Sequence, residues 1–560
     1  MRTTLRYLLV FLALLTVACD DDDGNNTSNT NNTNNVNNTN NVNNTNNTNN
    51  TNNVNNTNNT NNGNINNLNP RFDQVKAAFT AEVLSQSAYG GAIAIIEGGE
   101  VTFATGAGVK HPAHSDPVTA TTLFRVGSVT KMLTATGLLQ QVEAGAIDLS
   151  EPLTTYLPDF GFTNDATATS LILARHTLTH EGAMYNHWEY SATAPYDEET
   201  GLRAFYLGPY EDLAYLQSPP GTMYNYSNTG YSVAGLLTET GSGEHYVPYM
   251  TDNVFLPLGM ERTFFYPEDV LADGDYAHGW YKDAQGNAVI EAPDDYDNPW
   301  LRPCGYAWSS VLDLARFQRF LRDGDPTVLA QEHVDAMQSA QVNTLEVGDM
   351  LAYGYGLQLQ QGISLDTTEF YDLKLVAHGG NIGGFTAAFY FFPELDLGVV
   401  ILGSGIGLSF SETLVTAVRT LATLPSTSTA PEYPLETAKL PEYAGTYSEP
   451  HTFGTLEFTT DGSTLTVNAP DLDDASIPYS PIMVHYAGDS FIFNVQGSNF
   501  LGTFIYAGEA VPPYFRTRYA VSIREEGTKA RREPVRIDAK RLSRLLRAPV
   551  DTLPVLALPR

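Results

Sequence analysis

Residues 124–145 read FRVGSVTKMLTATGLLQQVEAG, and this stretch decides the fold. Ser128 lies three residues before Lys131. The chain has eight lysines, and Lys131 alone follows a serine at that spacing. Apolar residues recur at helical intervals from position 129 to position 142, which predicts a helix over 128–144 with one buried face. Residues three apart lie on the same side of a helix, so we expect the Ser128 hydroxyl to touch the Lys131 amine.

The serine–lysine pair has two interpretations. A hydroxyl is a poor nucleophile until a base takes its proton, and a partly desolvated lysine can be that base. Backbone N–H groups at the start of the helix would also favour negative charge that develops beside Ser128. On its own, the motif favours the plainer interpretation, a helix-capping serine followed by a solvated lysine.

A second motif, Tyr226-Ser227-Asn228, lies between a Pro-Gly turn at 220–221 and an apolar helical stretch at 233–237. A phenol near a lysine can relay a proton between a nucleophile and a leaving group. An asparagine amide can hold both the lysine and a substrate carbonyl. The plainer interpretation is a loop rich in tyrosine and asparagine, because both residue types are common in this chain.

A third motif is a short polar segment followed by two apolar runs. The segment reads His378-Gly379-Gly380-Asn381. The runs at 385–392 and 397–402 predict a strand, a turn and a second strand. Glycines at a strand edge allow a substrate to approach the backbone, so we expect the Asn381 N–H to complete an oxyanion hole with the N–H of Ser128. Taken alone, His378 is typical of a structural histidine.

In this order the three motifs resemble the serine β-lactamase and penicillin-binding protein superfamily, whose pattern is S-x-x-K, Y-x-N and K-T-G or a relative of it. Four further segments are similar to the branch that contains class C β-lactamases, DD-carboxypeptidases, D-aminopeptidases and esterases: 124–128, 149–158, 175–180 and 257–260. The resemblance covers residues 70–425. It implies an α+β fold in which an antiparallel sheet is flanked by helices, with the active site between the sheet and a helical region.

The resemblance also implies a role for each motif residue. Ser128 is the nucleophile that becomes acylated, and Lys131 is the base for that step. Tyr226 relays the proton and activates the deacylating water. The expected substrate-binding residues are Asn228, which orients Lys131, His378, which polarises the tyrosine or binds the far end of the substrate, and Gly379, Gly380 and Asn381. Neither a metal nor a cofactor is expected.

Departures from the family pattern bear on specificity. No lysine begins a K-x-G motif, and His378 stands where that lysine is expected. An unperturbed histidine, with a pKa of about 6.5, is mostly neutral at pH 7 and is a weaker anchor for a substrate carboxylate. Peptidase or esterase activity is therefore favoured over β-lactamase activity. Glu181-Gly182 replaces the usual T-S-G, and residues 304–310 are bulkier than is usual, so we expect a reshaped pocket.

The N-terminal residues predict export. Residues 1–18 combine a basic start, an apolar run and small residues before the expected cleavage site, which is typical of a signal peptide. The apolar run is too short to span a bilayer as a helix. Cys19 then resembles the lipidation site of a bacterial lipoprotein, although Thr16 stands where leucine is usual. The alternative is an ordinary signal peptide with an incidental cysteine.

Residues 19–69 are rich in Asp, Asn and Thr, and they contain almost nothing to bury. Such a tract cannot offset the entropy of an ordered chain, so it predicts a disordered tether between membrane and enzyme. Its Asn-x-Thr triplets also match glycosylation acceptors, and asparagine tracts can aggregate. In a bacterial lipoprotein we interpret the triplets as composition.

The middle of the chain predicts helices and strands in the order that the resemblance requires. Predicted elements are a hairpin at 91–96 and 101–105 and helices at 75–84, 128–144, 232–240, 311–321 and 414–424. A linker at 426–440 precedes an all-β domain at 441–525, a small barrel or sandwich, with a hairpin at Asp461-Gly462 and strands at 491–495, 500–506 and 518–523. This domain either shapes the mouth of the active site or binds glycan.

Composition excludes some partners. The net charge of −33, from 63 acidic against 30 basic residues, argues against nucleic acid. Residues 526–560 are nevertheless basic, and they predict either an amphipathic helix that touches an acidic surface or anionic lipid, or a solvated tail.

Cys304 has no disulfide partner if Cys19 carries lipid, and is expected to be buried. His176, His180 and His187 lack the H-E-x-x-H order of zinc proteases, so a structural role is preferred.

Together these observations predict an exported, lipid-anchored serine hydrolase that works through an acyl-enzyme. Cell-wall peptides with D-amino acids lead the substrate classes, small esters come second and penicillins third. The expected partners are a small peptide or ester, with peptidoglycan as the polymeric candidate, and a membrane that holds the lipid. The alternative from another class is a fold that has lost turnover and serves as a binding or sensing module.

Overall fold

The computed structural model describes residues 63–525, except for 87, 163–166, 186–198, 284–285 and 296. The predicted signal peptide, most of the tether with Cys19, His187 and the basic tail at 526–560 lie outside the described residues. Within the described part of the chain, no helix is both long and apolar enough to cross a membrane.

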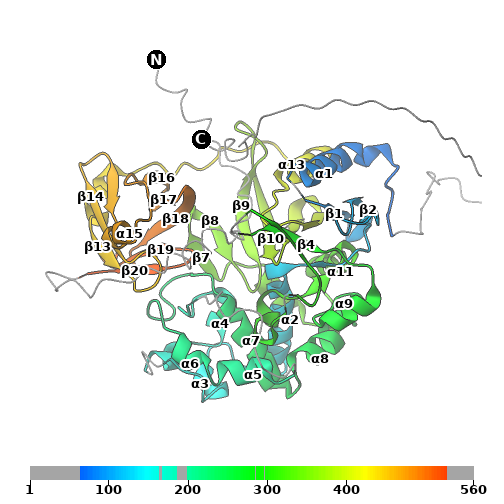
Figure 1. Ribbon diagram of the computed structural model, residues 1–560, viewed down its shortest axis with the longest axis horizontal. Helices are drawn as coiled ribbons and strands as arrows, with labels where there is room; N and C mark the ends of the chain where they lie inside the picture. Colours follow the sequence, from blue (N-terminus) through cyan, green and yellow to red (C-terminus); the bar gives the residue numbers. More distant parts are fainter. Residues whose placement is uncertain are drawn as a thin grey trace, which may run out of the picture. The chain divides into compact units, whose positions relative to one another are not determined.

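An eight-stranded antiparallel sheet forms the centre of the N-terminal region, which is the described part of the chain up to residue 425, in the order β2-β1-β12-β11-β10-β9-β8-β7 (Figure 1). Its strands are β1 (Gly90–Glu97), β2 (Glu100–Gly108), β7 (Val342–Leu345), β8 (Gly348–Tyr353), β9 (Gln358–Ser364), β10 (Phe370–Ile382), β11 (Phe385–Phe392) and β12 (Leu397–Ser404). The first hairpin pairs with the last strand through β1 and β12, which places sequence-distant ends side by side. The predicted α+β class with an antiparallel sheet is confirmed.

The two faces of this sheet bury different side chains. Along β1, Ile93 and Ile95 pack on one face with helices α1 (Asp73–Ser85) and α13 (Ser411–Leu421). Ala92 and Ala94 face the opposite side and belong to the core of the helical region. The alternation follows from the two-residue period of a strand, and both faces are apolar because each is covered by helices (Figure 1).

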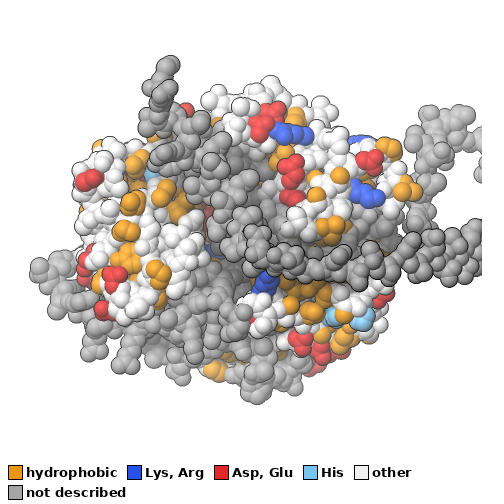
Figure 2. Space-filling view, turned by 45° about the horizontal axis from the view of Figure 1, so that its top comes forward, with side chains coloured by type: hydrophobic (Ala, Val, Ile, Leu, Met, Phe, Trp, Pro, Cys, Tyr) orange, Lys and Arg blue, Asp and Glu red, His pale blue; other side chains and the backbone are white. Residues whose placement is uncertain are grey.

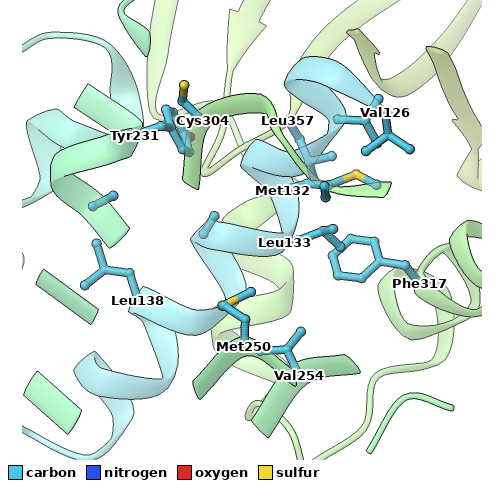
Figure 3. Packing of buried hydrophobic residues seen from close by; sticks show 14 of the residues in the cluster. Val126, Met132, Leu133, Leu138, Tyr231, Met250, Val254, Cys304, Phe317 and Leu357 are labelled. Carbon is cyan, nitrogen blue, oxygen red and sulfur yellow. The ribbon is translucent and has the colours of Figure 1, made fainter. Parts of the chain in front are cut away.

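Helix α2 (Thr130–Glu143) runs through the helical region, and a 3₁₀ turn, Gly127–Val129, leads into it. Eleven of its fourteen residues are buried, so the predicted single buried face is too narrow. Met132, Leu133 and Leu138 lie among Met250 and Phe317 (Figure 3). Its buried threonines are tolerated because their hydroxyls bond to carbonyls; Thr134 Oγ1, for example, donates to Pro303 O at 2.6 Å.

The other helices surround α2 or cover the sheet. They are α3 (Leu153–Tyr156), α4 (Arg175–Thr179), α5 (Gly201–Tyr206), α6 (Tyr210–Leu213), α7 (Asn228–Ser242), α8 (Tyr246–Met250), α9 (Pro267–Asp273), α10 (Arg302–Gly305), α11 (Val311–Asp323) and α12 (Gln331–Met337). Two short ladders complete the region, β3 (Phe124–Arg125) with β6 (Trp308–Ser309) and β4 (Gly279–Lys282) with β5 (Ala288–Glu291). The five predicted helices are confirmed as α1, α2, α7, α11 and α13.

The C-terminal domain is a second eight-stranded antiparallel sheet, in the order β15-β14-β13-β20-β19-β18-β17-β16. Its strands are β13 (Gly445–Ser448), β14 (Thr455–Thr460), β15 (Leu465–Asn468), β16 (Val484–Ala487), β17 (Ser490–Val495), β18 (Ser498–Ile505), β19 (Tyr514–Thr517) and β20 (Val521–Arg524), with short helices α14 (Leu440–Tyr443) and α15 (Pro470–Asp474). Met483 N donates to Leu465 O at 3.1 Å and Val467 N to Pro481 O at 2.8 Å, which brings the two edges together. The sheet is therefore nearly closed as a barrel.

One predicted strand in this domain begins later than expected. Residues 521–523 of the predicted strand at 518–523 belong to β20, whereas residues 518–520 form a turn between β19 and β20. The turn is stabilised by Thr517, whose Oγ1 accepts from the N–H groups of Tyr519 at 3.4 Å and Ala520 at 3.2 Å. Local hydrogen bonds that a threonine hydroxyl accepts from the backbone thus compete with the extended conformation that the apolar pattern favoured.

The β19–β20 hairpin packs directly on the N-terminal region. Arg516 is buried, and its guanidinium donates to Tyr224 O at 2.6 Å and to Thr344 O at 2.8 Å. Met223 joins Ile505 and Val521 in a small apolar cluster at the same contact. A buried guanidinium is tolerated only when its donors are satisfied, so these bonds fix where the hairpin sits.

Side chains of different kinds are mixed on the surface drawn in Figure 2. Among the described residues on that face, basic side chains lie singly or in small groups between acidic and apolar ones. Several basic side chains are paired: Arg419, for example, lies 2.6 Å from Glu369 Oε2. Exposed pairs of this kind contribute little to stability, typically about 0–1 kcal/mol each.

Candidate active site

Ser128 and Lys131 lie at the start of α2, and the structure brings them into contact. Lys131 is fully buried, and its Nζ donates to Ser128 Oγ at 3.1 Å. The same nitrogen donates to Asn228 Oδ1 at 2.7 Å and to the backbone oxygen of Cys304, in α10, at 2.6 Å. Three elements that are distant in sequence therefore meet at one amine.

The three oxygens around Lys131 match what an amine needs in order to act as a base. An ammonium carries three hydrogens, one for each of these acceptors. Once one hydrogen is lost, the two that remain can stay on Asn228 Oδ1 and Cys304 O, and the lone pair then faces the Ser128 hydroxyl. The site is thus arranged for proton transfer between Ser128 and Lys131 without movement of either side chain.

Tyr226 lies beside this pair because of how α7 begins. Ser227 is the N-cap residue of that helix, and its side chain accepts from Gly230 N at 3.2 Å. The capping serine leaves Tyr226 just outside the helix and Asn228 in its first turn, so both can reach the space around Lys131. The Lys131 Nζ lies 4.8 Å from the centroid of the Tyr226 ring.

The Tyr226 ring is held by neighbours from two regions of the chain. The His180 imidazole stacks on it with a centroid distance of 4.2 Å and an interplanar angle of 28°. The guanidinium carbon of Arg518 lies 3.6 Å from the ring centroid. Tyr226 itself is buried, so its position depends on this packing.

The two described histidines of the 176–180 segment have structural partners. His176 Nδ1 accepts from Leu173 N at 3.1 Å, and His180 Nδ1 accepts from Ser227 N at 2.9 Å. Burial, followed by the nearby charge of Lys131, holds the pKa of His180 well below its usual range. Each ring orients backbone around the site, and His180 also supports Tyr226. Among the described residues, no group of three or more potential ligands is arranged to hold a metal.

Strand β10 brings the glycine-rich segment against Ser128. A Cβ placed on Gly380 would lie 3.1 Å from Ser128 N and only 2.0 Å from Val126 O. Gly127 has φ +54°, and a Cβ there would lie 2.7 Å from Asn381 N. Both positions therefore require glycine, and the backbone of β10 lies close to the backbone at Ser128. The oxyanion hole formed by the N–H groups of Ser128 and Asn381 stays a prediction.

His378 is neutral and fully buried in β10. A carbonyl can only accept, so the 2.7 Å contact with Gly379 O places the proton on His378 Nδ1. Nε2 then accepts from the Tyr353 hydroxyl at 3.0 Å. Burial, together with the charge of Lys131, lowers the pKa of His378 to about 3. Its predicted substrate-binding role stays a prediction, and any such role cannot rely on positive charge.

The sequence analysis missed three groups that lie at the site. The Cys304 carbonyl was missed because every residue has a carbonyl and no motif marks this one; its thiol is buried, as predicted. Tyr353, at the end of β8, carries no motif either. Arg518 lies after the linker, and a single arginine in a predicted strand offers no signal that it reaches a site almost 300 positions earlier in the chain.

Comparisons with known proteins bear on the family and the fold of the chain. A family model described as beta-lactamase matches residues 72–418, more than half of the chain. PbpX of Bacillus subtilis (strain 168), which is named as a penicillin-binding protein, is 28% identical over 282 residues, which are 50% of this chain and 64% of that protein. Unguisins hydrolase ungD' of Aspergillus campestris (strain IBT 28561) is 27% identical over 323 residues, which are 56% of this chain and 57% of that protein.

The chain thus spans less than two thirds of the length of these two relatives. Among solved structures, the D-amino acid amidase from Ochrobactrum anthropi SV3, in complex with D-phenylalanine, superposes with a TM-score of 0.51 at 20% identity. The superposition covers 62% of this chain and 99% of that one. At that level of identity the likeness concerns the fold alone.

Replacing Gly380 with alanine should damage the site specifically. The new methyl group would collide with Val126 O and push β10 away from Ser128 N. If the Asn381 N–H is an oxyanion donor, kcat/KM should fall on the order of 10²–10³-fold. The comparison is Gly379→Ala, because a Cβ there meets nothing within 4 Å. An equal effect of the two substitutions, measured with one ester substrate, would contradict the assigned geometry.

The neutral His378 should make stability depend on acid. Its pKa is about 3 in the folded protein against an ordinary value of 6.5, so the unfolded chain binds more protons between these values. The free energy of unfolding should therefore fall as the pH drops below the ordinary value, by up to about 1.4 kcal/mol per pH unit from this group. Above that pH the contribution is constant. Urea unfolding at several pH values should show a shallower acid slope for His378→Gln, and identical slopes would rule the assignment out.

Proposed function

The chain belongs to the beta-lactamase family, and we propose that it is a serine hydrolase that acts through an acyl-enzyme on peptide-like amides or small esters. The observation that carries this proposal is the buried amine of Lys131 between Ser128 Oγ, Asn228 Oδ1 and Cys304 O. A structural lysine has no need to lie against a serine at the start of a helix, whereas a base for that serine does.

In the first half of the reaction, Ser128 Oγ attacks the substrate carbonyl carbon while Lys131 Nζ takes the hydroxyl proton. The carbonyl oxygen gains negative charge, which the N–H groups of Ser128 and Asn381 stabilise. Collapse of this intermediate breaks the bond to the leaving amine or alcohol. The leaving group receives a proton that passes from Lys131 through Tyr226, and Ser128 remains acylated.

In the second half, water replaces the leaving group. Tyr226 lies beside Lys131, and together they accept the proton of the attacking water. The water oxygen bonds to the acyl carbon, Ser128 Oγ departs and takes a proton back from Lys131, and the carboxylic acid product leaves. Asn228 keeps the amine in place through both halves because its amide oxygen stays bonded to Nζ.

Peptide stems with D-amino acids lead the substrate classes. The support is that the matched relatives are named as a penicillin-binding protein and as a hydrolase, and that the structural neighbour is named as a D-amino acid amidase. A β-lactam substrate comes later, because the residue at the K-T-G lysine position is the neutral His378. Small esters remain in the proposal because they need the same acyl-enzyme and less help for the leaving group.

A silent binding module is the competing function, and a covalent probe separates the two. A fluorophosphonate should label the full chain, and Ser128→Ala should lose both the label and activity, by on the order of 10³-fold or more. Cys304→Ala is the matched control, because this residue contributes its backbone oxygen and should keep the label. Labelling of Ser128→Ala, or no labelling and no turnover of amides, esters or a cephalosporin by the wild type, would remove the proposal.

Export with a lipid on Cys19 belongs to the same proposal, and its support is the sequence of the first nineteen residues. In a bacterial host, the full chain should partition into detergent, and its N-terminal peptide should carry the mass of a diacylglyceryl cysteine. Cys19→Ser should move the protein to the aqueous phase. The anchor is excluded if the two forms partition alike and the mature N-terminus is not residue 19.

A further inference from the structure

The ring of Tyr226 is covered on both faces by side chains from different parts of the chain. Arg518 lies in the turn between β19 and β20, and its guanidinium carbon is 3.6 Å from the centroid of that ring. The His180 imidazole stacks on the same ring at a centroid distance of 4.2 Å. One face of a phenol has no room for both groups at such short separations. The phenol is therefore clamped between an imidazole of the N-terminal region and a guanidinium of the C-terminal domain.

The turn that carries Arg518 is anchored to the segment that carries Tyr226. Arg516, two residues before Arg518, is buried and donates to Tyr224 O at 2.6 Å and to Thr344 O at 2.8 Å. Tyr224 itself lies two residues before Tyr226. A buried guanidinium keeps its place because its donors need these acceptors. The hairpin therefore fixes the position of Arg518 relative to the phenol.

The guanidinium also changes the electrostatics around the phenol. Burial, then the charge of Lys131 and more weakly that of Arg518, lowers the pKa of both His180 and His378. These two rings are therefore neutral, whereas Lys131 and Arg518 bring positive charge to the surroundings of Tyr226. A cation over the face of an aromatic ring is attracted by its π-electrons, and a nearby positive charge favours the anionic form of a phenol. Arg518 thus favours negative charge on the Tyr226 oxygen.

We infer that Arg518 is a positioning residue for proton transfer to the leaving group: with His180 it holds the Tyr226 hydroxyl in place, and its charge stabilises the phenolate that forms as the proton passes. In this step the bond from the acyl carbon to the leaving oxygen or nitrogen breaks, and the electron pair stays on that atom. The atom takes the proton of the Tyr226 hydroxyl, and the phenolate takes a proton from the Lys131 ammonium. The inference rests on the proposed hydrolase function and gives the C-terminal domain a part in that reaction.

A role in domain packing alone is the alternative. In that case the loss of Arg518 should lower kcat/KM for every substrate alike. A role in proton transfer instead predicts a loss that depends on the leaving group. Ethoxide is a strong base that must be protonated as it departs, whereas p-nitrophenolate is a stable anion that needs no proton. The decisive readout is therefore the ratio of kcat/KM between two esters of one acyl group, because a general loss of activity cancels in it.

The experiment uses the full chain and the ethyl and p-nitrophenyl esters of N-acetyl-D-alanine. Arg518→Ala should lower kcat/KM for the ethyl ester about 10–100-fold more than for the p-nitrophenyl ester, because general acid catalysis contributes about 10²–10⁴-fold and is weakened here but not removed. Arg518→Lys should restore part of the ratio, and Arg518→Met, which keeps the length without the charge, should restore less. If the wild type cleaves only the p-nitrophenyl ester, the readout is the acyl-enzyme, which should accumulate in Arg518→Ala after an unchanged burst of p-nitrophenol, since Tyr226 also serves deacylation.

A double-mutant cycle tests whether Arg518 acts through the phenol. Tyr226→Phe removes the hydroxyl, so it should lower kcat/KM for the ethyl ester more than Arg518→Ala does. In the Tyr226→Phe background, Arg518→Ala should then change the same kcat/KM by no more than about twofold, because the group that it positions is already gone. Full additivity of the two losses would show that Arg518 acts elsewhere.

The matched control is Arg524→Ala. Arg524 lies at the end of the same hairpin, but its guanidinium donates to Glu442 O and Ala444 O within the C-terminal domain. This variant should lose stability and keep the wild-type ratio between the two esters. A ratio that survives Arg518→Ala, or additive losses in the cycle, would overturn the inference and leave the proposed function intact. Failure of the wild type to hydrolyse either ester and to react with a fluorophosphonate would instead overturn the proposed function itself.

Discussion

The buried amine of Lys131 is the interaction on which the rest of the site depends. A lysine nitrogen with no exposure has to find oxygen partners inside the protein, because an uncompensated buried charge is costly. Its partners come from α2, from the start of α7 and from α10, so those elements must pack in one arrangement for the amine to be satisfied. The same requirement that stabilises the helical region brings Ser128, Lys131 and Asn228 together.

The sheet supplies the other wall of the site, and its contribution is made of backbone. Gly127 and Gly380 allow β10 to approach the first turn of α2 so closely that a methyl group on either would collide with backbone atoms. In the proposed reaction, side chains at the starts of α2 and α7 transfer protons, whereas the main-chain N–H groups of Ser128 and Asn381 stabilise negative charge. This division explains why the two sets of motifs differ so much in composition.

Positive charge in this site is distributed over two domains. His378 gives none, because burial and the nearby charge of Lys131 lower its pKa to about 3. Lys131 is fully buried. Arg518 lies on a hairpin of the C-terminal domain, and Arg516 of the same hairpin is buried against the N-terminal region. The C-terminal domain is therefore part of the environment of Tyr226, which favours the prediction that it shapes the mouth of the active site over the prediction that it binds glycan.

The sequence by itself determined the elements and motifs that local physics controls. The spacing of apolar residues predicted α2 and α11, and alternation and the Asp-Gly turn predicted the hairpins. The order of the three motifs predicted that Ser128, Lys131, Tyr226 and Asn228 belong to one site, and the structure brings these residues together. Only the tertiary structure decided that α2 is buried on all sides, that the Cys304 carbonyl completes the shell of the amine and that His378 is neutral. It also decided that residues 518–520, predicted as the start of a strand, form a turn that places Arg518 against Tyr226. These features depend on which surfaces meet across hundreds of residues, and neither the burial of a group nor the partner of a carbonyl is encoded in the residues next to it.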